Sequence, residues 1–106
     1  DEEKIGLSRN VFCSALKEEG IPCSSGYVKP LYLNPLYLEK RAFAFKHYTG
    51  NVVYKKGICP VAENLYEHKV IIIPICRAPA TIEDMDDIIN AIDKIIENKK
   101  ELEGIV

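Results

Sequence analysis

The chain has 106 residues, 47% of them hydrophobic and 28% charged, which is the composition of one globular domain with one core. Its formal net charge of −2 argues against nucleic acid and acidic membrane surfaces as partners, because both attract basic proteins. No apolar run approaches the roughly 20 residues that cross a bilayer, and no signal-peptide pattern opens the sequence. We therefore expect a cytoplasmic protein with no nucleic-acid or membrane partner.

The cysteines form no metal-binding pattern. There is no C-x-x-C pair and no histidine at ligand spacing, so we expect no metal site. An even count permits disulfides. However, Cys13 falls on the apolar face of a predicted helix and Cys76 ends a predicted buried strand, where free cysteine behaves as a small hydrophobe. We expect four free thiols in a reducing compartment, at Cys13, Cys23, Cys59 and Cys76.

Residues 8–19 are predicted to form the first helix. Ser8 suits the N-cap, because its hydroxyl can accept a hydrogen bond from the first turn. Gly20 ends the helix, since glycine most readily adopts the left-handed conformation. The apolar face repeats at helical spacing and comprises Val11, Phe12, Ala15 and Leu16.

The segment 20–37 contains two glycines and three prolines, so no regular helix can cross it. Residues 21–27 are expected to be extended, with Ile21, Cys23 and Tyr27 facing inward, and turns follow. Three of the six tyrosines lie here. Two interpretations remain open: a rigid loop that presents aromatic hydroxyls for binding, or a surface crossover whose tyrosines pack on the core.

Residues 38–57 are the least regular part of the pattern. We predict a short helix over Arg41–Tyr48 and a short strand over Val52–Tyr54. The region is locally basic and carries interleaved aromatic residues, so it could bind phosphate, although such regions are more often solvated loops. The basic residues are Lys40, Arg41, Lys46, Lys55 and Lys56.

A short helix is predicted from Pro60 to about His68, because proline suits the first helical position. Its apolar face comprises Val61, Ala62, Leu65 and Tyr66. A strand follows over residues 70–73. Its four residues are β-branched and apolar, which is typical of a strand that is covered on both sides.

The last helix begins at Thr81, with Asp84 placed three residues on as in a capping box. Acidic residues in its first turns match the helix dipole, so we assign them a structural role. The tail 98–106 is expected to fray. The apolar stripe of this helix is predicted to face the core and comprises Met85, Ile88, Ile89, Ile92, Ile95 and Ile96.

These elements predict an α+β fold, a small antiparallel or mixed sheet with helices packed on one face. We treat residues 1–106 as a single domain. A sheet of two strands is only marginally stable, and the sequence begins at Asp1 without a methionine. We therefore expect the chain to be the end of a larger protein.

Several short segments follow one another in a recognisable order. They are ALKEEGIP at 15–22, YVKPLYLNP at 27–35, CPVAE at 59–63, IP at 73–74 and TIEDMDDIINAI at 81–92. In order and approximate spacing, these segments resemble the C-terminal part of sugar aminotransferases of the DegT/DnrJ/StrS family. The resemblance extends over residues 8–97.

The resemblance implies that the parent protein is a fold-type I enzyme that uses pyridoxal phosphate to aminate a keto-sugar or cyclitol, often nucleotide-linked. In that family the cofactor lysine lies in the preceding large domain. The partners implied are that large domain of the same chain, a second copy in a homodimer, and the sugar. This segment would then close over the substrate, without cofactor-binding or catalytic residues of its own. No lysine matches the cofactor motif among Lys17, Lys29, Lys46, Lys55 and Lys56.

By this resemblance the expected substrate-binding residues are Tyr27, Tyr32 and Asn34. The family often has histidine at the position of Tyr32. Tyrosine keeps a hydrogen-bonding tip but does not titrate near neutral pH. Residues 38–58 match the family poorly, and substrate identity would be encoded there. The alternative is a stand-alone α+β binding or regulatory module without enzymatic activity, because fold-level likeness alone does not fix function.

Overall fold

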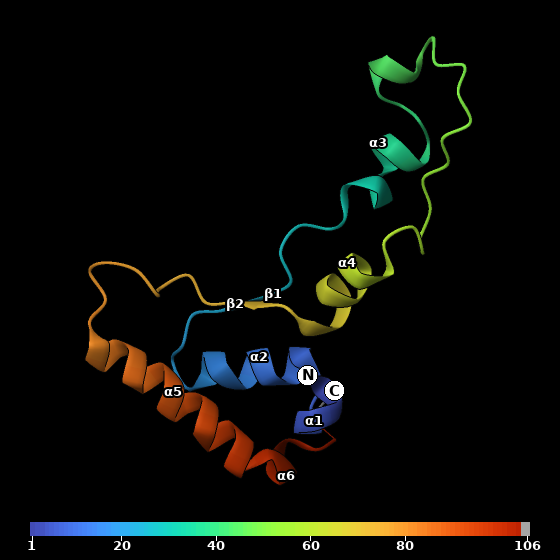
Figure 1. Cartoon of the computed structure of the whole chain (residues 1–106). Coiled ribbons are helices and arrows are strands. Elements are labelled where there is room, and N and C mark those ends of the chain that lie inside the picture. The colour runs from blue at the N-terminus through green and yellow to red at the C-terminus, as the bar shows by residue number, and fades with distance from the viewer. Residues whose placement is uncertain (105–106) are drawn as a thin grey trace.

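The computed structural model describes residues 1–104, which form a helical body and a projecting arm (Figure 1). The body contains α1 (Glu2–Ile5), α2 (Arg9–Glu18), β1 (Ser24–Ser25), β2 (Ile71–Ile72), α5 (Ile82–Glu97) and α6 (Lys99–Leu102). The arm, residues 27–58, contains η1 (Leu31–Leu33), α3 (Pro35–Leu38) and η2 (Phe43–Phe45). At its base lie α4 (Pro60–Asn64) and the π-helical turn η3 (Leu65–Lys69). The mixed helix-and-strand composition agrees with the predicted α+β class at this coarse level.

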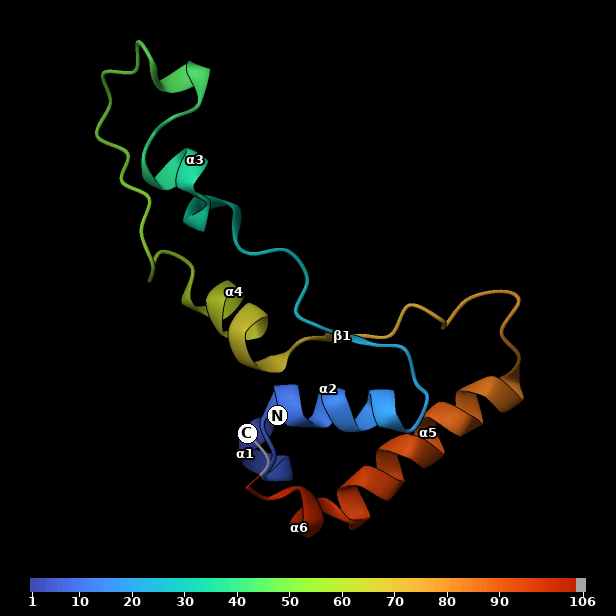
Figure 2. The same ribbon diagram turned by 180° about the vertical axis from the view of Figure 1, so that it is seen from behind.

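The core is built from side chains of α2, α5 and the segments next to them. Both views place the short sheet, α2 and α5 next to one another (Figures 1 and 2). Leu16 is 1% exposed and marks the centre of the core. Burial of such side chains is the main favourable term in folding. The buried cluster comprises Leu7, Phe12, Cys13, Leu16, Ile21, Cys23, Ile88, Ala91 and Ile95.

Helix α2 agrees closely with its prediction. The Ser8 hydroxyl accepts a hydrogen bond from Val11 N at 3.3 Å, so Ser8 is the N-cap. Gly20 has φ of 87° and follows the last helical turn. The chain therefore leaves α2 in the conformation that the glycine permits, and Ile21 enters the core.

Helix α5 also begins as predicted. Thr81 and Asp84 form a reciprocal capping box, in which Asp84 N donates to the Thr81 hydroxyl and Thr81 N donates to the Asp84 carboxylate. The predicted stripe is only partly correct. Ile88 and Ile95 are buried, whereas Ile89 is 54% exposed. Helix α5 packs mainly against α2, so the edge of its wide apolar stripe remains outside the core.

The sheet has two antiparallel strands, with Ser24 opposite Ile72 and Ser25 opposite Ile71. The strand predicted over 70–73 exists but pairs over only two residues. Its side chains are half-buried, so the prediction that it is covered on both sides is wrong. One face packs on the core through Ile71 and Ile73. Cys76, predicted at a buried strand end, is exposed.

The arm makes the molecule elongated, with extents of 55 × 36 × 18 Å. Its radius of gyration is 18.7 Å, against about 13 Å for a compact domain of this length. The strand predicted over 52–54 does not form, because no other strand of residues 1–104 lies beside it to supply hydrogen bonds. The helix predicted over 41–48 is reduced to the single 3₁₀ turn η2.

The C-terminal segment is more ordered than the predicted fraying of 98–106. Residues 99–102 form α6, and Leu102 packs against the core. The Lys99 ammonium donates to the Ile5 carbonyl at 2.9 Å, which ties α6 to α1. The prediction is therefore wrong for 99–102, and its last two residues, 105–106, lie outside the described part. None of the helices within residues 1–104 is both long and apolar enough to cross a membrane.

Candidate functional site

One buried carboxylate marks the point where the arm joins the body. Glu63 is 5% exposed, and it is the one buried polar or charged residue among those that the structure describes. It lies in the first turns of α4, which begins with Pro60 at the position where a missing amide costs nothing. A buried charge is retained only when hydrogen bonds replace its water, so its partners identify the organising contacts of this region.

Glu63 holds together both ends of the arm. The Tyr32 hydroxyl, from η1, donates to its carboxylate. The backbone amide of Gly57 donates to both carboxylate oxygens, at 2.8 and 3.0 Å. The Tyr32 hydroxyl also lies 3.5 Å from the Cys59 carbonyl. The outgoing segment 27–33 and the returning segment 57–59 are therefore fastened to one another through α4.

The charge states of this pair are fixed at neutral pH. Burial, followed by the hydrogen bond to Glu63, raises the pKa of Tyr32 to about 12. The Tyr32 hydroxyl and then the Gly57 and Cys59 amides lower the pKa of Glu63 below its ordinary value, against the opposing effect of burial. Neither group exchanges a proton near pH 7, so the pair positions the arm and is a poor general acid or base.

The three predicted substrate-binding residues lie along the first part of the arm. Tyr27 is 79% exposed, so the prediction that it faces inward is wrong. Tyr32 is half-buried against Glu63, and Asn34 is exposed between η1 and α3. No hydrogen bond within residues 1–104 joins their three side chains to one another. Their role toward a substrate stays a prediction.

Sequence reasoning missed Glu63 because it assigned the wrong face of α4 to the core. Val61, in the predicted apolar face, is 72% exposed, and Leu65 is also exposed. The helix passes directly into the π-helical turn η3, whose wider spacing breaks the 3.6-residue period. A usable signal was present, since a glutamate that follows Pro60 by three residues can reach back to amides at the helix start.

Four aromatic rings form a cluster in the distal arm. Tyr37, Phe45, Tyr48 and Tyr54 meet edge to face, with ring centroids 5.7 to 6.5 Å apart. Such pairs contribute beyond the area that they bury. They hold α3, η2 and the extended segment 52–56 together without a sheet.

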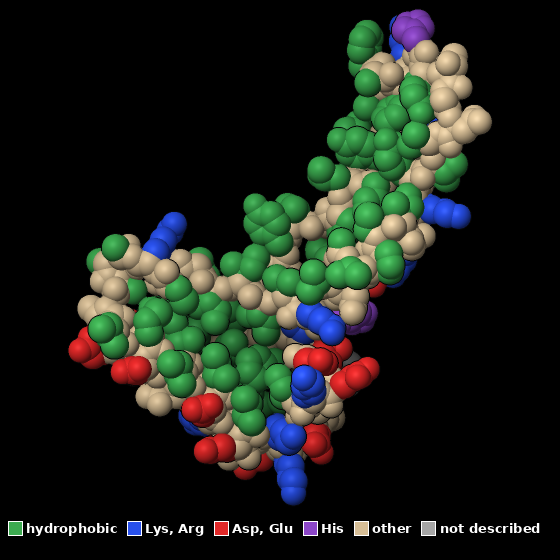
Figure 3. Space-filling model, viewed as in Figure 1, with side chains coloured by type: hydrophobic (Ala, Val, Ile, Leu, Met, Phe, Trp, Pro, Cys, Tyr) green, Lys and Arg blue, Asp and Glu red, His purple; other side chains and the backbone are tan. Residues whose placement is uncertain are grey.

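The outer surface of the arm is apolar and basic. Figure 3 shows hydrophobic side chains along much of its length in that view. Residues 27–58 carry six basic residues against one acidic, whereas the remaining residues carry eight basic against fifteen acidic. Contiguous exposed apolar side chains are typical of contact surfaces. Its most exposed large residues are Tyr27, Val28, Leu31, Phe43 and Val53.

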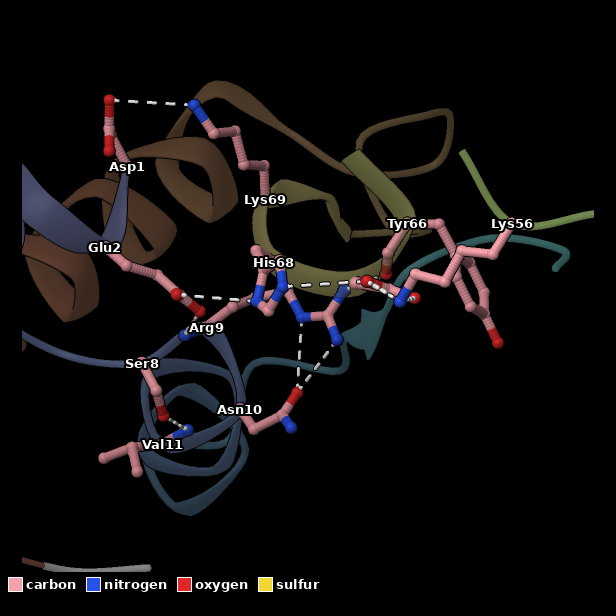
Figure 4. Close-up of polar contacts among 11 residues, drawn as sticks. Asp1, Glu2, Ser8, Arg9, Asn10, Val11, Lys56, Tyr66, His68 and Lys69 are labelled. Carbon is pink, nitrogen blue, oxygen red and sulfur yellow. Dashed lines mark hydrogen bonds and ion pairs between the residues drawn. The ribbon is translucent and has the colours of Figure 1, made fainter. Parts of the chain in front are cut away.

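Polar contacts also join the base of the arm to the body (Figure 4). The Arg9 guanidinium reaches from α2 to the Tyr66 carbonyl, and the Arg9 amide donates to Glu2 at 2.7 Å. Lys56 pairs with Glu67 at 2.7 Å, and this pairing raises the Lys56 pKa. These contacts connect α1, α2, η3 and the end of the arm.

The residues of this chain do not fit a pyridoxal phosphate site. A cofactor lysine must lie in an enclosed pocket, yet every lysine is exposed except Lys99, whose ammonium donates to a backbone carbonyl. Within residues 1–104 no three side chains of metal-ligating type lie close enough to hold an ion.

Comparison of the chain with models of protein families, with curated proteins and with solved structures gives no match. The resemblance to the DegT/DnrJ/StrS family rests on the sequence segments themselves, and its functional content is a proposal.

Proposed function

We propose that the chain is the C-terminal, substrate-closing domain of a pyridoxal-phosphate-dependent aminotransferase of the DegT/DnrJ/StrS type. The reaction of the complete enzyme is the amination of a keto-sugar or cyclitol. The cofactor supplies the electron sink when it is bound, and the large domain of the same chain would hold it. A second copy would complete a homodimer. The segment alone would not catalyse transamination.

The observation that carries the proposal is a contact between two segments on which the resemblance rests. Tyr32 belongs to the segment 27–35, and Glu63 belongs to the segment 59–63. The Tyr32 hydroxyl donates to the Glu63 carboxylate, although thirty-one positions separate the two residues. Chance matches at unrelated places would have no reason to meet at the one buried charge of the described chain.

The shape of the arm supports a closing role. It extends from the body on a base that Glu63 fastens, and it exposes large apolar side chains such as Tyr27 and Phe43. A surface of this kind suits contact with another protein surface or with a bound molecule. Because Pro30 and Pro35 restrict the backbone of the arm, little ordering entropy would be lost on contact.

In this role the proposed substrate contacts are Tyr27, Tyr32 and Asn34. A tyrosine ring packs on the face of a sugar while its hydroxyl makes a hydrogen bond. The Tyr32 proton is already donated to Glu63, so the Tyr32 oxygen would act toward a sugar hydroxyl as an acceptor. The basic excess of the arm favours a sugar that carries phosphate, as a nucleotide-linked sugar does.

The test uses the complete protein that contains this chain and follows its two half-reactions separately. Tyr32→Phe is expected to lower kcat/KM for the keto-sugar about threefold to tenfold, the loss of one ordinary hydrogen bond. The donor half-reaction should stay unchanged. Tyr37→Phe is the matched control, because its hydroxyl is on the same arm and makes no hydrogen bond within residues 1–104.

Two results would contradict the proposal. One is a complete protein that binds no pyridoxal phosphate and contains no cofactor-lysine motif upstream of this chain. That result would favour the stand-alone binding or regulatory module. The other is a Tyr32→Phe protein with wild-type sugar kinetics, which would return Tyr32 to a structural role.

A further inference from the structure

The sulfur atoms of Cys13 and Cys23 lie 3.1 Å apart in the core of the body. Cys13 comes from the buried face of α2, and Cys23 comes from the extended segment just before β1. They are 3% and 9% exposed. The Cys23 thiol also lies 3.3 Å from the Cys13 carbonyl. Both thiols are free, and their sulfur atoms lie in direct contact with one another.

We propose that Cys13 and Cys23 form a thiol–disulfide exchange site, at which a low-molecular-weight disulfide converts the pair into an intrachain disulfide. The bond needs the two sulfurs to approach by about 1 Å, to the usual length near 2.05 Å. This inference is independent of the proposed aminotransferase role, because it rests on the two thiols alone.

The reaction balances in two exchanges. One cysteine loses its proton to solvent and attacks the small disulfide, which forms a mixed disulfide and releases one thiolate. The other cysteine then loses its proton and attacks the sulfur of the first cysteine in this mixed disulfide. The intrachain S–S bond forms, the bond to the small molecule breaks, and the second thiolate leaves. Both thiolates take up protons. Two protein thiols are oxidised by two electrons, and one small disulfide is reduced to two thiols.

Cys23 is the cysteine that an oxidant would reach first. It is the more exposed of the two and is followed by Ser24 and Ser25, whose side chains face solvent. The sheet pairs over only two residues, so local opening of β1 requires far less than global unfolding. Burial, followed by contact with Cys13, raises the pKa of Cys23 to about 11 against the opposing charge of Lys17, so exchange at neutral pH is slow.

The test uses the chain with Cys59→Ser and Cys76→Ser, which removes the two exposed thiols and leaves the buried pair. Oxidised glutathione is the probe. The expected product has lost two hydrogens and carries no glutathione. Trypsin cleaves after Lys17, between the two cysteines. In a non-reducing peptide map, the peptides that contain Cys13 and Cys23 should therefore remain joined until a reductant separates them. Closing this short loop should raise Tm by about 10 °C.

A matched variant in the same background, Cys13→Ala, should stop at a glutathione adduct on Cys23. The proposal is overturned if the chain with both cysteines keeps two thiols after prolonged oxidation. It is equally overturned if that chain accumulates the stable glutathione adduct, or if its only disulfides join two chains.

Discussion

The Tyr32 hydroxyl donates to the buried Glu63 carboxylate, and this bond closes the arm at its base. The same carboxylate accepts from Gly57 on the returning segment. An arm that leaves the body without a sheet to hold it would otherwise be joined to the body mainly by the surface pair Lys56–Glu67 and the contacts of η3. Glu63 is therefore the side chain that fastens the two ends of the arm to one another at its base.

Replacing that side chain should loosen the arm before it unfolds the body. Glu63→Ala leaves the Gly57 amide without an acceptor and leaves the Tyr32 hydroxyl only the Cys59 carbonyl at 3.5 Å, so local opening becomes easier. We expect tryptic cleavage at the basic residues of the arm to become about tenfold faster in Glu63→Ala. Glu63→Gln should be cleaved at a rate between those of the wild type and Glu63→Ala. Glu39→Ala is the control, since Glu39 is exposed and, among the described residues, pairs only with the exposed Arg41, two residues further along the chain. Equal cleavage rates for Glu63→Ala and Glu39→Ala would contradict the anchoring role.

The lowered pKa of Glu63 predicts that the folded protein loses stability in acid. The folded-state pKa of Glu63 is lowered from its ordinary value of 4.5, so the unfolded chain binds a proton more readily than the folded one. The stabilisation is fully present above about pH 4.5 and is lost as the pH falls through the folded-state pKa. In thermal unfolding scans, the Tm difference between wild type and Glu63→Gln should shrink between pH 7 and pH 3. A difference that stays constant over this range would refute the assignment.

How far the sequence predicts this structure depends on whether the relevant contacts are local. Helices α2 and α5 follow from apolar periodicity and from the caps Ser8 and Thr81, which act within one turn. The pairing of Ser24 with Ile72 and the burial of Glu63 depend on residues far apart in the chain. No periodic pattern encodes such contacts.

The structure of the arm, too, depends on contacts that a local sequence pattern does not encode. The apolar residues of 52–54 suit a strand, yet the described chain places no strand beside them. Within the candidate site, Tyr32 was identified through the resemblance of the segment 27–35 to the DegT/DnrJ/StrS family. Its partner Glu63 was not, because a single glutamate in a helix is most often solvated.

The body core should respond sharply to truncation at its centre. Leu16 is 1% exposed, so Leu16→Ala should lower the free energy of unfolding by about 2–5 kcal/mol, because it removes buried atoms and leaves a cavity. Ile89→Ala is the matched control on α5, where a side chain 54% exposed should change stability far less. Urea denaturation of the two variants measures the difference. Equal losses would show that the assigned core is wrong.

The last prediction concerns Gly26, which lies where the sheet passes into the arm. It has φ of 68°, and its amide donates to the Val70 carbonyl at 2.7 Å. A Cβ at this position would lie 3.1 Å from the Tyr66 carbonyl oxygen. Gly26→Ala therefore combines left-handed backbone strain with a close approach to backbone that cannot easily move.

Gly20 supplies the comparison that separates these two costs. It has a similar φ of 87°, but a Cβ there would meet nothing within 4 Å. Gly20→Ala should therefore show the backbone strain alone, about 1–3 kcal/mol. Gly26→Ala should cost more and should also shift the amide resonances of the Tyr66–Val70 turn, because the clash acts on its backbone. If the two variants lose the same stability and those resonances stay in place, Gly26 does not fix the arm against η3.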